Sequence, residues 1–219
     1  MRVGIFDSGR GGVLAGRYFC DAMAGVDTVI FSDTENAPYG SKTEAELVRL
    51  VSSGISRLVS LGCDIVLIAC CTASTVHHRL PCELARISIP IIEPTAREAC
   101  RATKNKRIAV ASTEATRRSR AFCRSIGSIL PDAAVLSIAS PLLVALAEGG
   151  VCDEDLNFAA HAELLRVIES AKEFSADTLV LGCTHYAAFE RTAERLSSMR
   201  VINSARVGAL ALAEKIKEE

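Results

Sequence analysis

The sequence predicts an α/β fold with two similar halves, each a mostly parallel sheet flanked by helices. Short apolar runs alternate with longer amphipathic segments, an order that produces parallel strands joined by right-handed crossovers. Several of the short runs are apolar almost throughout, as in strands covered on both faces. The layout of residues 64–72 also returns at 177–185: an Asp, a strand-forming run, a small residue and a cysteine.

The individual elements follow from these patterns in chain order. The apolar runs predict strands at 3–6, 28–32, 65–69, 89–92, 107–111, 134–138, 178–181 and 201–202. The amphipathic segments predict helices at about 11–24, 43–61, 73–86, 95–103, 114–127, 141–148, 153–174, 185–198 and 204–218.

The repeat indicates how the chain divides into domains. Residues 90–94 look like the first crossing between the halves, and the chain returns near Asn203. We therefore expect a first domain of residues 1–93 and 203–219 and a second domain of residues 94–202. Because ligands bind beyond the carboxyl ends of parallel strands, we expect a small-molecule site in a cleft between the halves.

Composition and charge argue against several classes of function. The 219-residue chain has a formal net charge of −1, so nothing points to nucleic acid or an anionic membrane as a partner. No apolar run approaches the roughly 18 residues of a membrane span, and a strand pattern begins at Arg2 without a signal peptide. We expect a cytoplasmic protein.

The nine cysteines do not suggest a disulfide framework. Their number is odd and their spacing irregular. The chain has no Cys-x-x-Cys pair, so we expect no metal site. Most of the cysteines are expected to be small buried hydrophobic residues.

Two polar clusters follow strands in the first half. At 7–12, glycines permit a tight turn and a close ligand approach, and amides at the next helix start suit a carboxylate. Asp7 or Ser8 as a helix N-cap is the structural alternative. Neither a GxGxxG motif nor a P-loop lysine is present. The second cluster, 38–42, reads as a turn that joins the site only if the cleft forms.

Two thiols stand at the ends of the repeated strands. Cys70 precedes the helix expected from 73, and a helix N-terminus lowers the pKa of a thiol. Cys183 has His185 two residues later, and imidazole can stabilise a thiolate or relay its proton. Either cysteine alone could be structural. The shared layout favours a pair that adds and removes one proton at opposite faces of a carbon.

Together these segments resemble the aspartate/glutamate racemase superfamily, and within it the enzymes that act on glutamate. The resemblance covers nearly the whole chain, with motifs in family order at 4–12, 38–40, 69–74, 93–94, 141–148 and 181–186. It implies two domains related by a pseudo-twofold axis, no cofactor, and interconversion of L- and D-glutamate for bacterial peptidoglycan. Members are often dimers, so the resemblance also leaves a homodimer open.

Carried over by position, the resemblance assigns roles to individual residues. Cys70 would act on D-glutamate and Cys183 on L-glutamate as the two acid/base groups. Asp7 and His185 would assist the thiols, and Glu148 would be a further acidic helper. The substrate would be held, largely through its carboxylates, by Asp7, Ser8, Pro38, Tyr39, Gly40, Cys71, Thr72, Thr116 and Thr184.

The chain departs from the family pattern at several positions. Cys71 stands where an Asn commonly helps to bind substrate, and a thiol is a weaker hydrogen-bonding group. Ala187 replaces a common Pro, and Asn203 a frequent Asp. Three alternatives stay open: an aspartate racemase, a weakly active protein that binds an acidic amino acid, and a cysteine hydrolase or lyase that forms a covalent intermediate.

Overall fold

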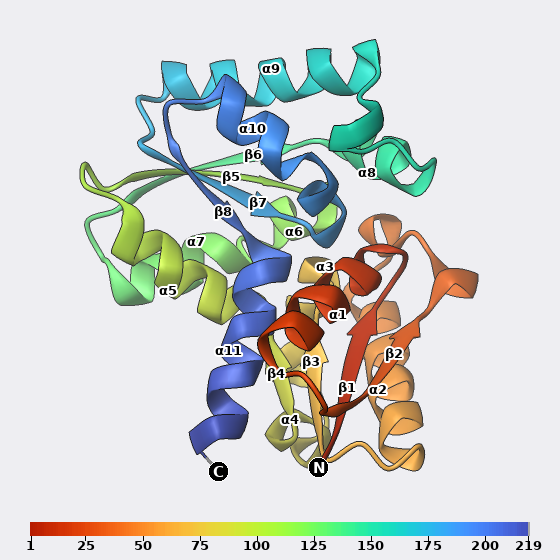
Figure 1. Cartoon of the computed structure of the whole chain (residues 1–219). Coiled ribbons are helices and arrows are strands. Elements are labelled where there is room, and N and C mark those ends of the chain that lie inside the picture. The colour runs from red at the N-terminus through yellow and green to blue at the C-terminus, as the bar shows by residue number, and fades with distance from the viewer. Residues whose placement is uncertain (219) are drawn as a thin grey trace.

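The computed structural model, which describes residues 1–218, contains two parallel four-stranded sheets, one in each lobe of the molecule (Figure 1). In the first lobe the order is β2-β1-β3-β4, and in the second it is β6-β5-β7-β8. The strands are β1 (Arg2–Asp7), β2 (Asp27–Ser32), β3 (Ile65–Ile68), β4 (Ser88–Pro90), β5 (Arg107–Ser112), β6 (Ala134–Ala139), β7 (Thr178–Gly182) and β8 (Arg200–Asn203). Each sheet places its first strand between its second and third. The predicted class, two similar α/β halves, is confirmed.

Helices connect the strands in both lobes. The α-helices are α1 (Gly11–Ala22), α2 (Glu44–Ser60), α3 (Cys71–Ser74), α4 (Cys82–Arg86), α5 (Ile92–Ala102), α6 (Glu114–Ser119), α7 (Ala121–Ile129), α8 (Pro141–Glu148), α9 (Phe158–Glu173), α10 (Glu190–Leu196) and α11 (Ser204–Glu218). Short 3₁₀ helices are η1 (Thr34–Asn36), η2 (Tyr39–Ser41), η3 (His77–Arg79), η4 (Asp153–Asp155) and η5 (Thr184–Phe189).

A layer of helices lies between the two sheets and belongs to a core that both lobes share (Figure 1). Successive strand residues point to opposite faces, so Ile5 of β1 faces this central core while Phe6 faces the outer core under α2. The far face of the second sheet is covered by α9 through Leu164 and its neighbours. The central core combines Phe19 of α1, Ala96 of α5, Phe122 of α7 and Leu212 of α11 with Val110 of β5.

The predicted helix 73–86 is wrong in its continuity. The structure has α3, then η3, and then α4, which begins only after Pro81. Pro81 is extended, with ψ at 140°, and a proline ring disfavours helical geometry at the residue before it. His77 and His78 therefore lie in a 3₁₀ turn rather than in an α-helix.

Other predicted helices differ for local reasons. The helix at 114–127 breaks at Arg120, whose φ of 55° is left-handed, a conformation that does not continue a right-handed helix. The helix expected from 153 starts at Phe158, because the Asn157 side chain caps it by accepting from the Ala160 amide at 2.9 Å.

α5 starts at Ile92, earlier than predicted, because Pro94 falls in the first turn of the helix, where its missing N–H costs nothing. Residues 184–189 form η5 before α10 begins.

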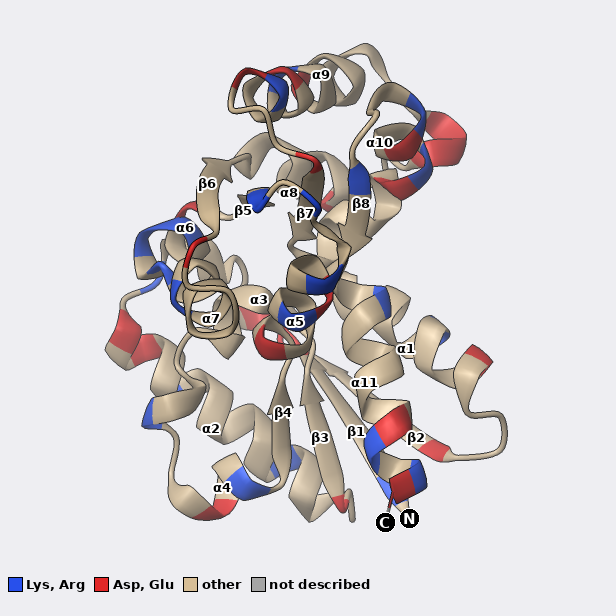
Figure 2. Ribbon diagram, turned by 90° about the vertical axis from the view of Figure 1, so that its left-hand side faces the viewer, with Lys and Arg blue, Asp and Glu red and all other residues tan. Residues whose placement is uncertain are grey.

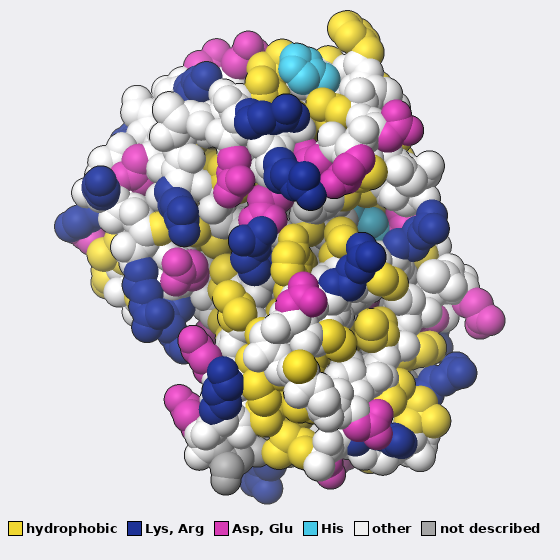
Figure 3. All heavy atoms as spheres, in the orientation of Figure 1, with side chains coloured by type: hydrophobic (Ala, Val, Ile, Leu, Met, Phe, Trp, Pro, Cys, Tyr) yellow, Lys and Arg dark blue, Asp and Glu magenta, His cyan; other side chains and the backbone are white. Residues whose placement is uncertain are grey.

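Charged side chains of both signs are mixed over the surface seen in Figure 3. Within the described chain, no helix has both the length and the apolar character needed to cross a membrane. All nine cysteines are described, and each carries a free thiol.

Candidate active site

A cavity of about 520 Å³ lies between the lobes, beyond the carboxyl ends of β1, β3 and β7. Cys70 reaches it from the first lobe and Cys183 from the second, and each residue is only 6% exposed. The two predicted thiols therefore line the same cavity. The lining residues are Ser8, Ala37, Pro38, Tyr39, Gly40, Ser41, Cys70, Thr72, Thr113, Glu114, Pro141, Val144, Ala145, Glu148, Cys183 and His185.

Strand register explains why the two thiols occupy equivalent places. β1 pairs with β3 at Phe6 and Ile68, and β5 pairs with β7 at Ala111 and Leu181. In each lobe the cysteine follows its paired strand residue by two positions. Both cysteines thus emerge where the central strands end and the chain turns into helix.

The Cys70 thiol is held by groups of the first lobe. It accepts from the Ala73 amide at 3.5 Å, and it lies 3.2 Å from the Ser8 hydroxyl. The prediction of a lowered pKa for Cys70 is wrong. Burial, assisted by the nearby Asp7 carboxylate, raises the pKa of Cys70 to about 11. The four-residue α3 does not offset that burial.

The Cys183 thiol begins a chain of titratable groups. Its sulfur lies 3.6 Å from Nδ1 of His185, and Nε2 of His185 contacts the carboxylate of Glu148. Glu148 in turn accepts from the Arg10 amide at 3.2 Å, a contact that crosses between the lobes. Burial raises the pKa of Cys183 well above its ordinary value. The geometry suits proton passage between thiol, imidazole and carboxylate.

Asp7 ties the lobes together behind the cavity. Its carboxylate accepts from the Gly9 amide at 2.8 Å and from the Thr184 hydroxyl of the second lobe at 2.9 Å. The N-cap alternative is wrong: Arg10 occupies the N-cap of α1, and no side chain caps that helix. Burial raises the pKa of Asp7.

Four predicted site residues do not line the cavity itself. Asp7, Cys71, Thr116 and Thr184 lie behind its wall. Cys71 belongs to the central core, where its thiol donates to the Ser204 hydroxyl at 3.6 Å. Thr116 lies 3.1 Å from the hydroxyl of Thr72.

Thr113 is a lining residue that the sequence reasoning missed. It lies two positions after Ala111, as Ser8 lies two positions after Phe6, so it is the equivalent of Ser8 in the second lobe. The repeat alone could have identified it. Its hydroxyl lies 2.9 Å from that of Thr72, which joins the lobes beside the cavity.

The pocket loop at residues 37–41 is held by an aromatic residue. Tyr39 is buried and donates from its hydroxyl to Asp33 at 2.7 Å, while its ring packs near Phe6. This anchoring keeps Pro38 and Gly40 at the cavity wall. Desolvation raises the pKa of Tyr39, so the hydroxyl keeps its proton to donate.

Comparison with known proteins places this site in context. Residues 21–212 match the profile of the Asp/Glu/Hydantoin racemase family. A glutamate racemase of Geobacter metallireducens is 36% identical over 98% of this chain and 80% of its own length. The crystal structure of glutamate racemase from Aquifex pyrophilus superposes with a TM-score of 0.80 at 33% identity, covering 100% of this chain and 85% of that one. The glutamate racemase from Francisella tularensis shares the fold, with a TM-score of 0.88 at 23% identity over 99% and 81% of the two chains.

The fold, the paired thiols and these relatives define an isomerase of the amino-acid racemase class. The chain belongs to the Asp/Glu/Hydantoin racemase family. The resemblance predicted from its sequence motifs is confirmed.

The raised pKa of Cys70 predicts a loss of stability at alkaline pH. Below pH 9 the Cys70 thiol is protonated in both the folded and the unfolded chain, so it does not lower the free energy of unfolding there. As pH rises from the ordinary value of 9.0 toward about 11, only the unfolded chain loses the proton, and folding becomes less favourable. Two pKa units correspond to about 3 kcal/mol.

Urea unfolding at pH 8 and pH 10.5 measures this effect. The wild type should lose more free energy of unfolding between these values than Cys70→Ser, while Cys20→Ser at an exposed cysteine should behave as wild type. An identical pH dependence for Cys70→Ser and the wild type would contradict the assignment.

Gly11 is predicted to be essential for the closed arrangement of the lobes. A Cβ there would lie 2.3 Å from the Thr184 hydroxyl oxygen and 3.1 Å from the backbone nitrogen of His185. Gly11→Ala should therefore push η5 away from α1 and misplace the Cys183 side of the site, with a rate loss of about 10²-fold.

Gly127→Ala is the matched control, because nothing lies within 4 Å of a Cβ at that position in α7. Racemisation rates and thermal unfolding of both variants provide the measurement. Unchanged activity in folded Gly11→Ala would show that this contact does not hold the site.

Proposed function

We propose that the protein interconverts L- and D-glutamate by proton transfer between two thiols, without a cofactor. The observation that carries the proposal is that Cys70 and Cys183 enter one cavity from different lobes, each at the same strand position. We propose glutamate as the substrate because these relatives are glutamate racemases. The resulting D-glutamate would serve peptidoglycan synthesis, and hence cell-wall biogenesis and cell shape.

In the proposed mechanism, one cysteine starts as thiolate and the other as thiol. The thiolate takes the α-proton from one face of the substrate, and the thiol returns a proton to the opposite face. Cys183 would act on L-glutamate and Cys70 on D-glutamate. Each turnover leaves the two protonation states exchanged, so the protons must redistribute before the next turnover in the same direction.

Neighbouring groups prepare each thiol for its task. Burial raises the pKa values of both thiols, so thiolate formation needs a proton acceptor close by. His185 would accept the proton of Cys183, with Glu148 stabilising the imidazolium. On the other side, Ser8 is within hydrogen-bonding distance of the Cys70 sulfur and would stabilise its thiolate.

The carbanionic state must be stabilised by polar groups around the α-carboxylate. Hydroxyls of Ser8, Thr72 and Thr113 line the cavity beside Gly40. The lining includes no Lys or Arg side chain within the described residues. We therefore infer that neutral donors hold the substrate carboxylates and that Thr116, Thr184 and Cys71 support these donors from behind.

The proposal extends to the organisation of the chain. We infer domains of residues 1–93 plus 203–219 and of 94–202, because β8 ends at Asn203 and α11 then packs against α1. We further propose a cytoplasmic enzyme, with a homodimer as its assembly and with neither nucleic acid nor membrane as a partner.

Polarimetry with purified protein tests the substrate. L-glutamate should lose its optical rotation to zero, and L-aspartate should change much more slowly. Faster loss with aspartate would identify an aspartate racemase. If the optical rotation of both amino acids stays constant, the protein does not racemise them, and the alternative of a protein that only binds an acidic amino acid is favoured.

A further inference from the structure

The carboxylate of Glu190 is buried at the place where the chain passes from one lobe to the other. Glu190 is the first residue of α10 and directly follows η5, and only 6% of it is exposed. Beside it, β8 of the second lobe ends and α11 begins. Figure 2 shows α11 running alongside α1 of the first lobe. The mechanism proposed above makes no use of this buried charge.

Three donors from three elements share one oxygen of this carboxylate. Oε2 of Glu190 accepts from the guanidinium of Arg206 in α11 at 2.7 Å, and from the side-chain amide of Asn203 in β8 at 2.9 Å. It also accepts from the hydroxyl of Tyr18 in α1 at 3.2 Å. A buried carboxylate is costly unless it is paired and hydrogen-bonded in this way. We call these four residues the interlobe cluster.

Tyr18 is the member of the interlobe cluster that belongs to the first lobe. Its hydroxyl also accepts from the side-chain amide of Asn203 at 3.3 Å, and the Arg206 guanidinium lies over its ring, 5.1 Å from the centroid. The hydroxyl of Tyr18 therefore fastens α1 to the second lobe, and its ring packs against the helix that follows β8.

The beginning of α1 is fastened to the second lobe as well. Asp7 accepts from the Thr184 hydroxyl at the start of η5, and the Arg10 amide donates to Glu148 of α8. Tyr18 lies eight residues after Arg10, which is roughly 12 Å further along a helix. Two separated points thus hold α1 against the second lobe, so that the helix cannot turn about either point alone.

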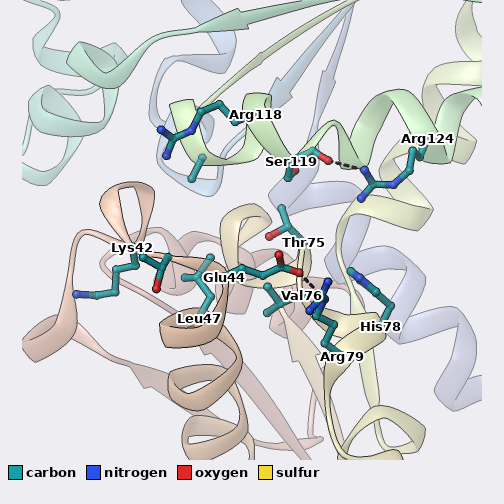
Figure 4. A pocket seen from close by; sticks show the side chains of 12 residues that line it. Lys42, Glu44, Leu47, Thr75, Val76, His78, Arg79, Arg118, Ser119 and Arg124 are labelled. Atoms are coloured by element: carbon teal, nitrogen blue, oxygen red, sulfur yellow. Dashed lines mark hydrogen bonds and ion pairs between the residues drawn. The ribbon is translucent and has the colours of Figure 1, made fainter.

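The charged contacts on another side of the molecule do not bridge the lobes. A hollow of about 550 Å³ separates the start of α2 and η3 from α6 and α7 (Figure 4). Of the interactions drawn there, the pair of Arg79 with Glu44 stays within the first lobe, and the bond from Arg124 to Ser119 stays within the second. The buried charge of Glu190, by contrast, contacts both lobes.

We propose that Glu190 is a positioning residue of the active site. Through Tyr18 it holds α1 aligned with η5, and this alignment sets how far Cys183 lies from Cys70. Cys70 belongs to the same lobe as α1, and Cys183 directly precedes η5. Misplacing a reacting group by roughly 1 Å can cost about 10²-fold in rate. The effect on turnover rests on the proposed function, whereas the alignment of the lobes does not.

Hydrogen exchange of one backbone amide measures this alignment without relying on activity. The Arg10 amide donates to Glu148 of the other lobe, so it exchanges faster when α1 shifts away from the second lobe. Glu190→Gln and Tyr18→Phe should each speed its exchange about tenfold, as followed by NMR. A loss of global stability alone would speed the Val66 amide in the first sheet but not the amide of Arg10.

Kinetics of the single and double variants connect the alignment with turnover. Each single variant should lower kcat for L-glutamate about tenfold. The double variant should lose little more, because both substitutions break the same contact. Glu154→Gln is the matched control: it removes an ion pair with Arg191 of the same α10 that stays within the second lobe, and it should react as wild type.

The outcomes separate positioning from general stability and from the proposed function. Unchanged exchange of the Arg10 amide in both variants would overturn the proposal. So would additive losses of kcat, an unchanged kcat, or an equal loss in Glu154→Gln. A wild type without racemase activity would instead reject the proposed function, and the exchange of the Arg10 amide would still decide whether Glu190 holds the lobes in alignment.

Discussion

Cys70→Ser and Cys183→Ser are each expected to lower kcat for racemisation by at least about 10³-fold in both directions. A serine hydroxyl is far less acidic than a thiol, so one face of the substrate loses its acid/base group. Both directions of the reaction need both faces, which is why either substitution alone is sufficient. Serine is close in size to cysteine, and both cysteines line the cavity.

The paired variants also make an asymmetric prediction. Each should still exchange the α-hydrogen of one enantiomer with deuterated solvent, through the thiol that remains. Cys70→Ser should exchange L-glutamate, and Cys183→Ser should exchange D-glutamate. NMR of the α-proton measures this, with Cys20→Ser at an exposed position as the control. Full racemase activity in either active-site variant would refute the two-thiol mechanism.

His185→Asn is expected to lower kcat by about 10²-fold or more. The imidazole is the only titratable group in hydrogen-bonding distance of the Cys183 sulfur among the described residues. Without it, Cys183 keeps its proton at neutral pH because burial disfavours the thiolate. Glu148→Gln should show a smaller loss in the same direction, since it acts through His185.

The loss should fall on the Cys183 face alone. Added to Cys70→Ser, His185→Asn should strongly slow solvent exchange of L-glutamate, whereas added to Cys183→Ser it should leave exchange of D-glutamate at Cys70 near the rate of Cys183→Ser alone. His161→Asn, in α9 and outside the cavity lining, is the matched control. Equal slowing of both exchange reactions would mean that His185 supports the fold of the site rather than one thiol.

The sheets were predictable because the sequence signal and the physical requirement coincide. Strands buried on both faces need apolar residues throughout, and Val66, Leu67 and Ile68 provide them without interruption. Helix continuity was less predictable. Nothing in the sequence around Arg120 indicates a left-handed φ at that residue. The break between α6 and α7 there depends on how the two short helices pack.

The two active-site thiols were predictable because the same sequence layout, a strand that ends in a cysteine, occurs once in each half of the chain. The cavity wall was not fully predictable, since lining depends on which face of a helix meets the cleft. Val144 and Ala145 of α8 line the cavity although nothing in their residue types indicates it. Cys71 follows Cys70 directly, yet its side chain turns into the core toward Ser204. Neighbours in sequence at a strand end point in different directions, and only the fold shows which one faces the ligand.

The central claim is that two sulfurs address opposite faces of one carbon. Conversion of L-glutamate in deuterated water tests it most directly, with NMR following each enantiomer from the first turnovers. The account predicts D-glutamate that carries deuterium at the α-carbon while the remaining L-glutamate keeps its hydrogen. D-glutamate that retains the original hydrogen would contradict it, because a single group would then have moved the same proton from one face to the other.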